Sequence, residues 1–341
     1  MSESALRPMF TVAIPTLNRG ATYLPMAIQA VLEQTCSDLE LIVSDNASTD
    51  GTEHYVRSLS DPRIRYIRRP HTIPAGQHFS VVAGEARGEW LVLHQDDDLL
   101  TRDFLARARA ALQASPASSM YAAPIWRQAR NHGYHARLMR PQHGYHDARV
   151  LCDGIEVFDG NYAAIQFFDP IRHFVHPTVA IRLSALHAIG GYDPGTTYQA
   201  DLVTQAKVLF NSTLLYDPRP GGISHVHAAN FMRAKPRSFR KQFFRTSYLK
   251  LIHAFEERDI DWRTLLAGYL AALSSQEIIG CLNEWTYYRT PYRLQRLGFS
   301  ALRKNWEGSD LGLLRKCLSK LGPRNLARYA LSSMTDWQRR H

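Results

Sequence analysis

The sequence has few cysteines, no long apolar run and no glycine-rich phosphate loop. Its 341 residues include only four cysteines. Their wide spacing predicts reduced thiols and argues against a disulfide framework or a zinc site. The longest apolar stretch near the C-terminus, residues 265–273, is well short of the roughly 20 residues that a membrane span needs. The start of the chain lacks the charged and apolar segments of a secretory signal. These absences predict a cytoplasmic protein with no transmembrane helix.

The charge of the chain is unbalanced. Its apolar content of 45 % and charged content of 21 % are those of a folded protein. The net charge of +10 comes mainly from residues 233–245 and from the tail between Arg303 and Arg340. A basic surface of this kind suits phosphorylated substrates or the anionic inner face of the plasma membrane, so a peripheral membrane contact is left open beside a solvated basic face. No nucleic-acid-binding motif accompanies it, and we expect no nucleic-acid partner.

Strand and helix patterns alternate over the first 125 residues. Such alternation predicts an α/β fold with a Rossmann-like, mainly parallel sheet flanked by helices. From about residue 232 the pattern is helical, which predicts a first domain at 1–231 and a helical C-terminal region at 232–341. The expected strands are residues 9–16, 39–45, 63–67 (at the sheet edge), 89–94 and 118–125.

Polar residues follow three of the predicted strands where each strand ends. They are Pro15–Thr16, Asp45–Asn46 and the stretch from His94 to Asp98. The carboxyl ends of parallel strands meet at one edge of a sheet, and this edge is where open α/β sheets bind ligands. The three consecutive carboxylates at positions 96–98 repel one another unless a cation lies between them. The pattern therefore predicts a ligand site at this edge.

A short repeat lies between the two predicted regions. The segment HGYHAR at residues 132–137 recurs as HGYHDAR at residues 143–149. Similar alternation in two nearby segments predicts the two arms of a β-hairpin. A histidine metal site is the alternative, although the spacing matches no defined zinc motif.

Four segments in order resemble the signature of family 2 glycosyltransferases, which are inverting, nucleotide-sugar-using enzymes of the GT-A fold. The segments are VAIPTLNR, LIVSDNASTDGT, GEWLVLHQDDD and GGYDPGTTYQAD, and the resemblance runs from about residue 9 to 230. It implies that a sugar is moved from a nucleotide diphosphate to an acceptor hydroxyl. Mn²⁺ or Mg²⁺ is the implied cofactor, because these hard cations take carboxylate and phosphate oxygens.

The resemblance also implies roles for single residues. Asp96 is common to both registers of the metal motif. In one register Asp-X-Asp lies on Asp96–Asp98, and in the other His94 takes the place of a first Asp. The implied nucleotide contacts are Pro15, Thr16, Asn18, Arg19, Asp45, Asp96 and Asp97, and the implied metal ligands are Asp96, Asp98 and His227, with His225 as the alternative histidine. His176 is the implied acceptor contact.

Asp201 is the general base that the resemblance implies. Many relatives carry Glu-Asp where this chain has Ala200–Asp201, so the chain lacks the Glu and keeps the Asp. One carboxylate near the acceptor hydroxyl suffices for a single in-line displacement. A structural alternative stays open, in which Asp201 stabilises a helix N-terminus. Asp45 likewise has the alternative of capping the turn that follows it.

The identity of the substrates is left open by the sequence. The donor is expected to be a UDP-, dTDP- or GDP-linked sugar, and the acceptor a glycan, a lipid-linked molecule or another hydroxyl compound, in bacterial polysaccharide or glycoconjugate synthesis. The C-terminal helices leave a homodimer open. Two other functions are considered. Nucleotidyl transfer would require a basic glycine-rich segment after the first strand, and PTLNRGATY does not supply one. Non-catalytic binding of a nucleotide or glycan stays open because the chain has Ala200 where many relatives have Glu.

Overall fold

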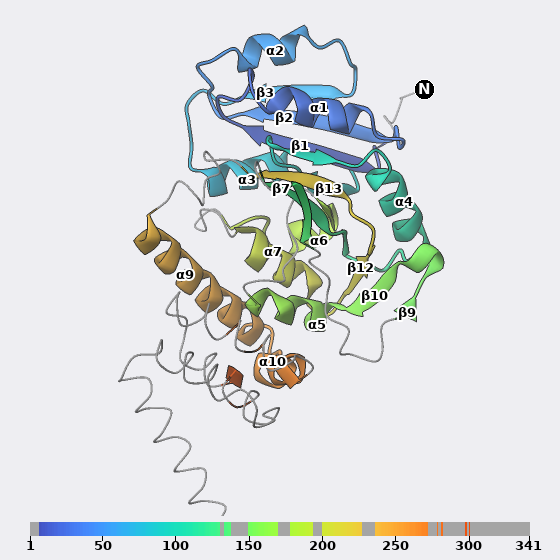
Figure 1. The fold of residues 1–341 in the computed structure, drawn as a ribbon, viewed down its shortest axis with the longest axis vertical. Helices are drawn as coiled ribbons and strands as arrows, with labels where there is room; N and C mark the ends of the chain where they lie inside the picture. Colours follow the sequence, from blue (N-terminus) through green and yellow to red (C-terminus); the bar gives the residue numbers. More distant parts are fainter. Residues whose placement is uncertain are drawn as a thin grey trace, which may run out of the picture. The chain divides into compact units, whose positions relative to one another are not determined.

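The computed structural model describes residues 7–129, 133–137, 149–169, 178–193, 200–226 and 236–271, and a few residues between 278 and 300. The described chain forms two compact units (Figure 1). The first contains the residues up to Phe167 and those from 178 to 226. The second contains Phe168, Asp169 and the residues from 236 onward.

The first unit is built on a nine-stranded sheet in the order β3-β2-β1-β4-β11-β6-β12-β10-β9. Strands β3, β2, β1 and β4 are parallel, whereas β11 is antiparallel to both of its neighbours. The prediction of a mainly parallel α/β sheet with 63–67 at its edge is therefore confirmed. The strands are β1 (Phe10–Thr16), β2 (Leu39–Asp45), β3 (Ile64–Arg68), β4 (Trp90–Leu93), β6 (Met120–Ala122), β9 (Arg149–Val150), β10 (Glu156–Asp159), β11 (Val179–Arg182) and β12 (Thr213–Tyr216).

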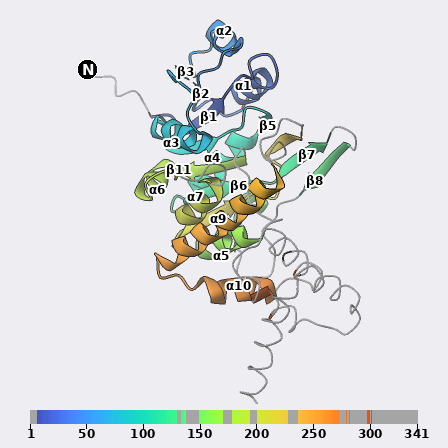
Figure 2. The same cartoon turned by 90° about the vertical axis from the view of Figure 1, so that its left-hand side faces the viewer.

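A second, four-stranded sheet has the order β5-β13-β7-β8. Figure 2 shows β7 and β8 side by side. The strands are β5 (Asp98–Leu100), β7 (Ile125–Ala129), β8 (Gly133–Arg137) and β13 (Gly222–Val226).

One sequence-based prediction about strands is wrong, and another lies largely outside the described residues. The single strand expected at 118–125 is divided between the two sheets, as β6 and β7. Pro124 lies at the break and has no backbone N–H to continue the ladder. The β-hairpin expected between residues 132–137 and 143–149 stays a prediction, because residues 143–148 lie outside the described residues. Of the described parts, β8 pairs with β7, and Arg149–Val150 pairs with β10.

Helices cover the main sheet through alternate residues of its strands. Phe10, Val12 and Ile14 of β1 share one core with apolar residues of α1, α2 and α4. The opposite face packs on α3, where the buried His78 ring bonds the Ser44 hydroxyl at 2.9 Å. The helices of this unit are α1 (Leu24–Leu32), α2 (Thr52–Ser58), α3 (Ala75–Gly84), α4 (Phe104–Ala114), α5 (Gly160–Ile165), α6 (Leu183–Ala188) and α7 (Ala200–Leu209), with the short helices η1 (Cys152–Gly154) and η2 (Gln166–Phe168).

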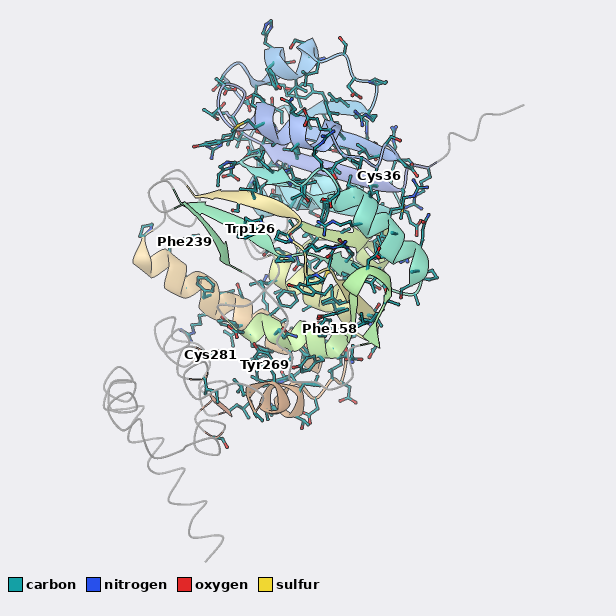
Figure 3. All side chains as sticks on the ribbon, turned by 45° about the vertical axis from the view of Figure 1, so that its right-hand side comes forward. Cys36, Trp126, Phe158, Phe239, Tyr269 and Cys281 are labelled. Atoms are coloured by element: carbon teal, nitrogen blue, oxygen red, sulfur yellow. The ribbon has the colours of Figure 1, made fainter. Side chains whose placement is uncertain are left out.

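The second unit contains α9 (Arg237–Glu256) and α10 (Trp262–Ala271). Phe168 packs against the rings of Tyr248, Phe255 and Trp262, and the Tyr269 hydroxyl donates to the buried Asp169 carboxylate at 2.7 Å. Cys36 in the first unit and Cys281 in the second, both labelled in Figure 3, are buried free thiols. Within the described residues, no helix has the length and apolarity needed to span a membrane.

Candidate nucleotide site at the strand ends

Three parallel neighbours, β2, β1 and β4, end at the same edge of the main sheet. Thr16 and Asp45 are opposite each other in the register, and Ala13 pairs with Leu93, so the 94–98 loop begins beside the end of β1. The Thr16 hydroxyl donates to Asp96 Oδ2 at 2.8 Å. The structure thus joins the first and third of the predicted strand ends through side chains.

The loops after β1 and β2 are bonded to each other. The Asn18 backbone N–H donates to the Ser48 hydroxyl, and Asn18 Oδ1 accepts from the Thr49 N–H, both at 2.8 Å. Asn18 has a φ of 55°, a left-handed conformation that asparagine tolerates better than most residues. A Cβ on Gly20 would lie 2.5 Å from the Thr52 backbone, so only glycine allows this close approach. Together these contacts fix the shape of the β1 loop.

Asp45 is fully buried, and both of its carboxylate oxygens are engaged. Oδ1 accepts from the Ser48 N–H at 2.7 Å, and Oδ2 accepts from the Tyr66 hydroxyl at 2.6 Å. The Arg68 guanidinium lies 3.8 Å from Oδ2. The bond from the Ser48 N–H caps the turn after β2, which is the alternative role predicted for Asp45 from the sequence. A nucleotide contact by Asp45 stays a prediction that would use the remaining lone pairs.

Asp96 is a nearly buried carboxylate with incomplete charge compensation. Its side chain is 16 % exposed, and the nearest cation is the Arg19 guanidinium, whose Nε lies 4.0 Å from Oδ2. Burial raises the pKa of Asp96 to about 6, and the charge of Asp97 adds to this, although the Thr16 hydrogen bond opposes it. Such a group gains from a further cation or hydrogen-bond donor. Arg19 also lies over the Tyr23 ring, at 5.7 Å from its centroid.

Asp98 faces the second sheet. Its Oδ1 accepts from the His225 backbone N–H at 3.1 Å, and the Ser224 hydroxyl also donates to its carboxylate. The His225 ring donates from Nδ1 to the Asp97 carbonyl at 2.9 Å, since a carbonyl can only accept. The buried His94 ring donates from Nε2 to the Asp98 carbonyl at 3.0 Å. The loop of three aspartates is therefore held by two imidazole rings and by β13.

The stability of the protein should fall with pH because of Asp98. Burial, together with the charge of Asp97, raises its pKa to about 8 against an unfolded value near 3.8. The folded state therefore keeps a proton that the unfolded state loses. This stabilisation is complete below pH 3.8 and disappears as pH rises through 8, with a slope of about 1.4 kcal/mol per pH unit for one proton. Asp98→Asn keeps an oxygen acceptor for His225 and should flatten the curve.

Urea unfolding from pH 5 to 9 in a chelating buffer checks this expectation. Asp61→Asn is the control, because hydrogen bonds from Arg63 lower the pKa of Asp61 and its contribution lies below this range. Equal slopes for the parent protein and Asp98→Asn would contradict the assignment to Asp98.

Asp201 lies in the first turn of α7. Its Oδ1 accepts from the adjacent Leu202 N–H at 2.9 Å. Burial raises the pKa of the Tyr192 phenol, and the negative charge of Asp201 raises it further. The buried Tyr192 ring thus lies in the electrostatic field of the Asp201 carboxylate. The position also agrees with the alternative in which an acid stabilises the helix N-terminus.

Two predicted site residues, His176 and His227, lie outside the described residues. Among the residues that are described, no group of three or more His, Cys, Asp and Glu side chains is arranged to hold a metal ion by itself. The sequence reasoning missed Tyr66 and Ser224. Strand register would have indicated Tyr66, which pairs with Val43 two residues before Asp45 on the same face. Ser224 is opposite Asp98 across a sheet that joins distant segments, and no local pattern indicates it.

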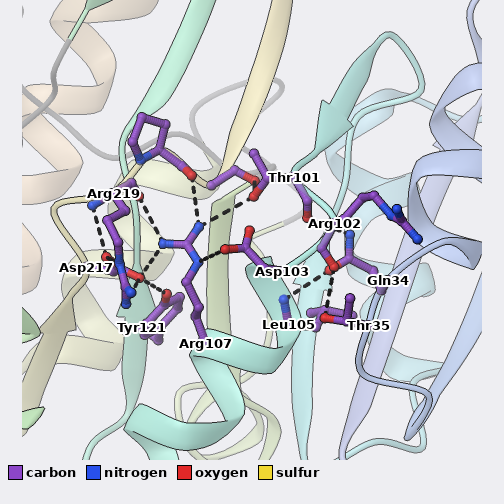
Figure 4. A network of polar contacts seen from close by, with 12 residues as sticks. Gln34, Thr35, Thr101, Arg102, Asp103, Leu105, Arg107, Tyr121, Asp217 and Arg219 are labelled. Atoms are coloured by element: carbon purple, nitrogen blue, oxygen red, sulfur yellow. Dashed lines mark hydrogen bonds and ion pairs between the residues drawn. The ribbon is translucent and has the colours of Figure 1, made fainter. Parts of the chain in front are cut away.

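A buried ionic network holds the start of β13 (Figure 4). Asp217 is fully buried and accepts from Arg107, from the Arg219 Nε at 2.9 Å and from the Tyr121 hydroxyl at 2.8 Å. Arg107 also donates to the Pro220 carbonyl at 2.8 Å. The Thr101 N–H, just after β5, donates to the Gly221 carbonyl at 2.9 Å. We call Asp217, Arg107, Arg219 and Tyr121 the anchor network.

Comparison with known proteins agrees with this geometry. The sequence model described as Glycosyl transferase family 2 matches residues 11–186, about half of the chain. A PGL/p-HBAD biosynthesis glycosyltransferase of Mycobacterium tuberculosis is 36 % identical over 126 residues, which are 35 % of this chain and 48 % of that protein. The chain thus spans about half the length of the curated relatives it matches. Shorter matches include a succinoglycan biosynthesis protein of Rhizobium meliloti.

Solved structures of similar fold cover most of the chain. Staphylococcus aureus TarS 1–349 in complex with UDP-GlcNAc has a TM-score of 0.58 and 15 % identity, and the match covers 87 % of this chain and 88 % of that one. The mannosyltransferase PcManGT of Pyrobaculum calidifontis, in complex with GDP-Man and Mn²⁺, has a TM-score of 0.51 and 21 % identity, with 88 % of each chain covered. At these identities the likeness establishes the fold.

Proposed function

The chain belongs to glycosyl transferase family 2, and on this premise we propose that it transfers a sugar from a nucleotide diphosphate to an acceptor hydroxyl with inversion. The observation that carries the proposal is the 2.8 Å bond between Thr16 and Asp96, which joins the ends of two parallel strands where α/β sheets bind nucleotides. The names of the relatives support a role in bacterial polysaccharide or glycoconjugate synthesis.

The nucleotide diphosphate sugar is proposed to bind along the loops after β1 and β2. The backbone from Pro15 to Asn18 and the hydroxyl of Thr16 line this edge, and the Arg19 guanidinium, 23 % exposed, is positioned to meet a phosphate. The bonds between Asn18, Ser48 and Thr49 hold the loops in place before the donor arrives. A preformed site of this kind lowers the entropic cost of binding.

The residues fit a divalent cation. Mg²⁺ and Mn²⁺ are usually held by one or two carboxylates together with substrate phosphates, so a complete protein cage is not required. Asp96, whose pKa burial raises to about 6, is the first ligand we propose. Asp98 already accepts two hydrogen bonds from β13, so we propose Asp97 as the second carboxylate that binds the cation. This choice corresponds to the alignment of the metal motif in which His94 takes the place of the first Asp. His227 stays a predicted third ligand. When bound, the cation stabilises negative charge on the departing diphosphate.

Asp201 is the proposed general base. It would accept the proton of the acceptor hydroxyl as that oxygen attacks the anomeric carbon, in a single displacement. This assignment rests on the resemblance of residues 190–201 to the family segment, because Asp201 lies beyond the matched residues 11–186. The acceptor contact at His176, the membrane contact and the homodimer stay predictions, since the residues concerned lie wholly or largely outside the described chain.

A thermal-shift panel tests the proposed function. UDP, GDP, dTDP and their sugar conjugates are added with Mn²⁺, with Mg²⁺ or with chelator. We expect one nucleotide series to raise Tm in a cation-dependent way, because a ligand at 100 times its Kd adds about 2.7 kcal/mol of stability. The control is ATP with the same cations, which should give no matching shift. If no nucleotide diphosphate or sugar conjugate raises Tm at millimolar concentration, the proposal fails.

A further inference from the structure

Gln205 is a buried amide for which the described part of the chain supplies no hydrogen bond. Its side chain, on α7, is fully buried, and neither Oε1 nor Nε2 has a hydrogen-bond partner among the described residues. Gln34 shows the usual arrangement: its Nε2 donates to the Ala30 and Thr101 carbonyls, and its Oε1 accepts from the Leu105 N–H. An unsatisfied buried polar group destabilises the fold by about 1–3 kcal/mol. Such exceptions are rare enough to require an explanation.

The position of Gln205 on α7 relates it to Asp201. The two residues are four positions apart, so their side chains lie one above the other on one face of the helix. Helical side chains lean toward the N-terminus, which directs the Gln205 amide toward the turn that carries Asp201. Asp201 is only partly buried and Gln205 is completely buried. The amide is therefore enclosed on the same face of α7 that carries the partly exposed carboxylate.

The neighbourhood of this helix face is polar as well as buried. Tyr192, 1 % exposed, lies in the field of the Asp201 charge. The buried side chain of Gln166, in η2 directly after α5, also has an unbonded Nε2 among the described residues, and α5 packs on α7. If Gln205 only filled space, a methionine of similar length would do so without burying an unbonded amide.

We propose that Gln205 is a positioning residue for Asp201. With substrates bound, its Nε2–H donates to the Asp201 carboxylate, directly or through one buried water, and fixes the orientation of the oxygen that takes the proton. The inference rests on the proposed function of Asp201 as the base. Without substrates, the unbonded amide destabilises the folded protein. This cost disappears when the amide bonds to Asp201 in the complex with substrates.

The test compares Gln205→Met with Asp201→Asn and with the double variant. The assay is release of nucleotide diphosphate from the donor sugar that the thermal-shift panel identifies, with water as the acceptor. We expect Gln205→Met to raise Tm and to lower kcat about tenfold with the donor KM unchanged. The double variant should be no slower than Asp201→Asn alone. Gln205→Asn, whose amide is one methylene shorter, should lose kcat without the rise in Tm.

Gln166→Met is the matched control, because it removes another buried amide with an unbonded Nε2. It should leave kcat and the donor KM unchanged. If Gln205→Met also leaves both unchanged while Asp201→Asn loses turnover, the positioning inference is overturned and the proposed base stands. If Asp201→Asn retains turnover, the base assignment fails and Gln205 loses its role with it. Should Gln205→Met not fold, Gln205→Asn with unchanged kcat overturns the inference.

Discussion

Asp96→Asn should abolish sugar transfer while the protein stays folded. The substitution keeps an oxygen that can accept from the Thr16 hydroxyl at 2.8 Å, so the contact between β1 and the 94–98 loop survives. It removes the charge that we propose to hold the cation, and charge stabilisation at a departing diphosphate amounts to several kcal/mol. We therefore expect kcat to fall by about 10³-fold or more. The cation-dependent part of the nucleotide thermal shift should disappear with it.

The thermal-shift and kinetic measurements on Asp96→Asn need one comparison to be decisive. Asp98→Asn changes a second carboxylate of the same loop, but one whose Oδ1 accepts from the β13 backbone. We expect it to lose much less activity and to retain a cation-dependent thermal shift. If the two variants have the opposite order, Asp98 is the main ligand and the Asp-X-Asp register is correct. If Asp96→Asn keeps full turnover at saturating donor, Asp96 has no catalytic role.

The parallel part of the fold was readable from the sequence because its signals are local. The runs that form β1, β2 and β4 are mainly apolar, as strands covered on both faces are. β1 and β2 end in Thr16 and Asp45, and His94 follows β4 directly. The convergence of Thr16, Asp45 and the 94–98 loop followed from topology alone. The edge position of β3 was also indicated by its charged residues, and its lower burial in the structure agrees with this.

The remaining features depend on partners far away in the chain. Asp96 and Asp98 look alike in the sequence, yet one bonds Thr16 and the other bonds the backbone of β13, more than 120 residues later. The strand predicted at 118–125 carries Pro124 within it, and this residue marks the change from one sheet to the other. The anchor network and the buried Gln205 amide have no local signature, because only tertiary packing decides which polar groups are enclosed.

Asp217→Ala is expected to give the largest loss of stability among the variants considered. Burial alone would raise the pKa of Asp217, but hydrogen bonds from Arg219 and the charge of Arg107 outweigh it and lower the pKa. Removal of the carboxylate leaves Arg107, whose side chain is only 9 % exposed, without its buried counter-charge. It also leaves the buried Tyr121 hydroxyl without its acceptor. Breaking a buried pair in this way costs about 3–5 kcal/mol, which urea unfolding at pH 7 measures.

The control for Asp217→Ala is Glu53→Ala, which breaks ion pairs with Arg57 and Arg68 near the surface. The Glu53 side chain is 42 % exposed, and exposed pairs contribute about 0–1 kcal/mol each. Because a lowered carboxyl pKa stabilises the folded state only above the unfolded value, the difference between the parent protein and Asp217→Ala should shrink as pH falls below 4. Equal losses for Asp217→Ala and Glu53→Ala at pH 7 would show that the network does not anchor the fold.

Loss of the anchor network should also weaken nucleotide binding at the proposed site. Arg107 bonds the Pro220 carbonyl, and Thr101 bonds the Gly221 carbonyl, immediately before β13 supplies Ser224 and His225 to the loop of aspartates. Asp217→Asn keeps the size and shape of the side chain and one acceptor oxygen, but its NH2 group cannot accept the bonds made to the other oxygen. It should stay folded at 20 °C and bind the nucleotide less tightly than the parent protein. If Asp217→Asn binds the nucleotide as tightly as the parent protein does, the anchor network stabilises the fold without shaping the nucleotide site.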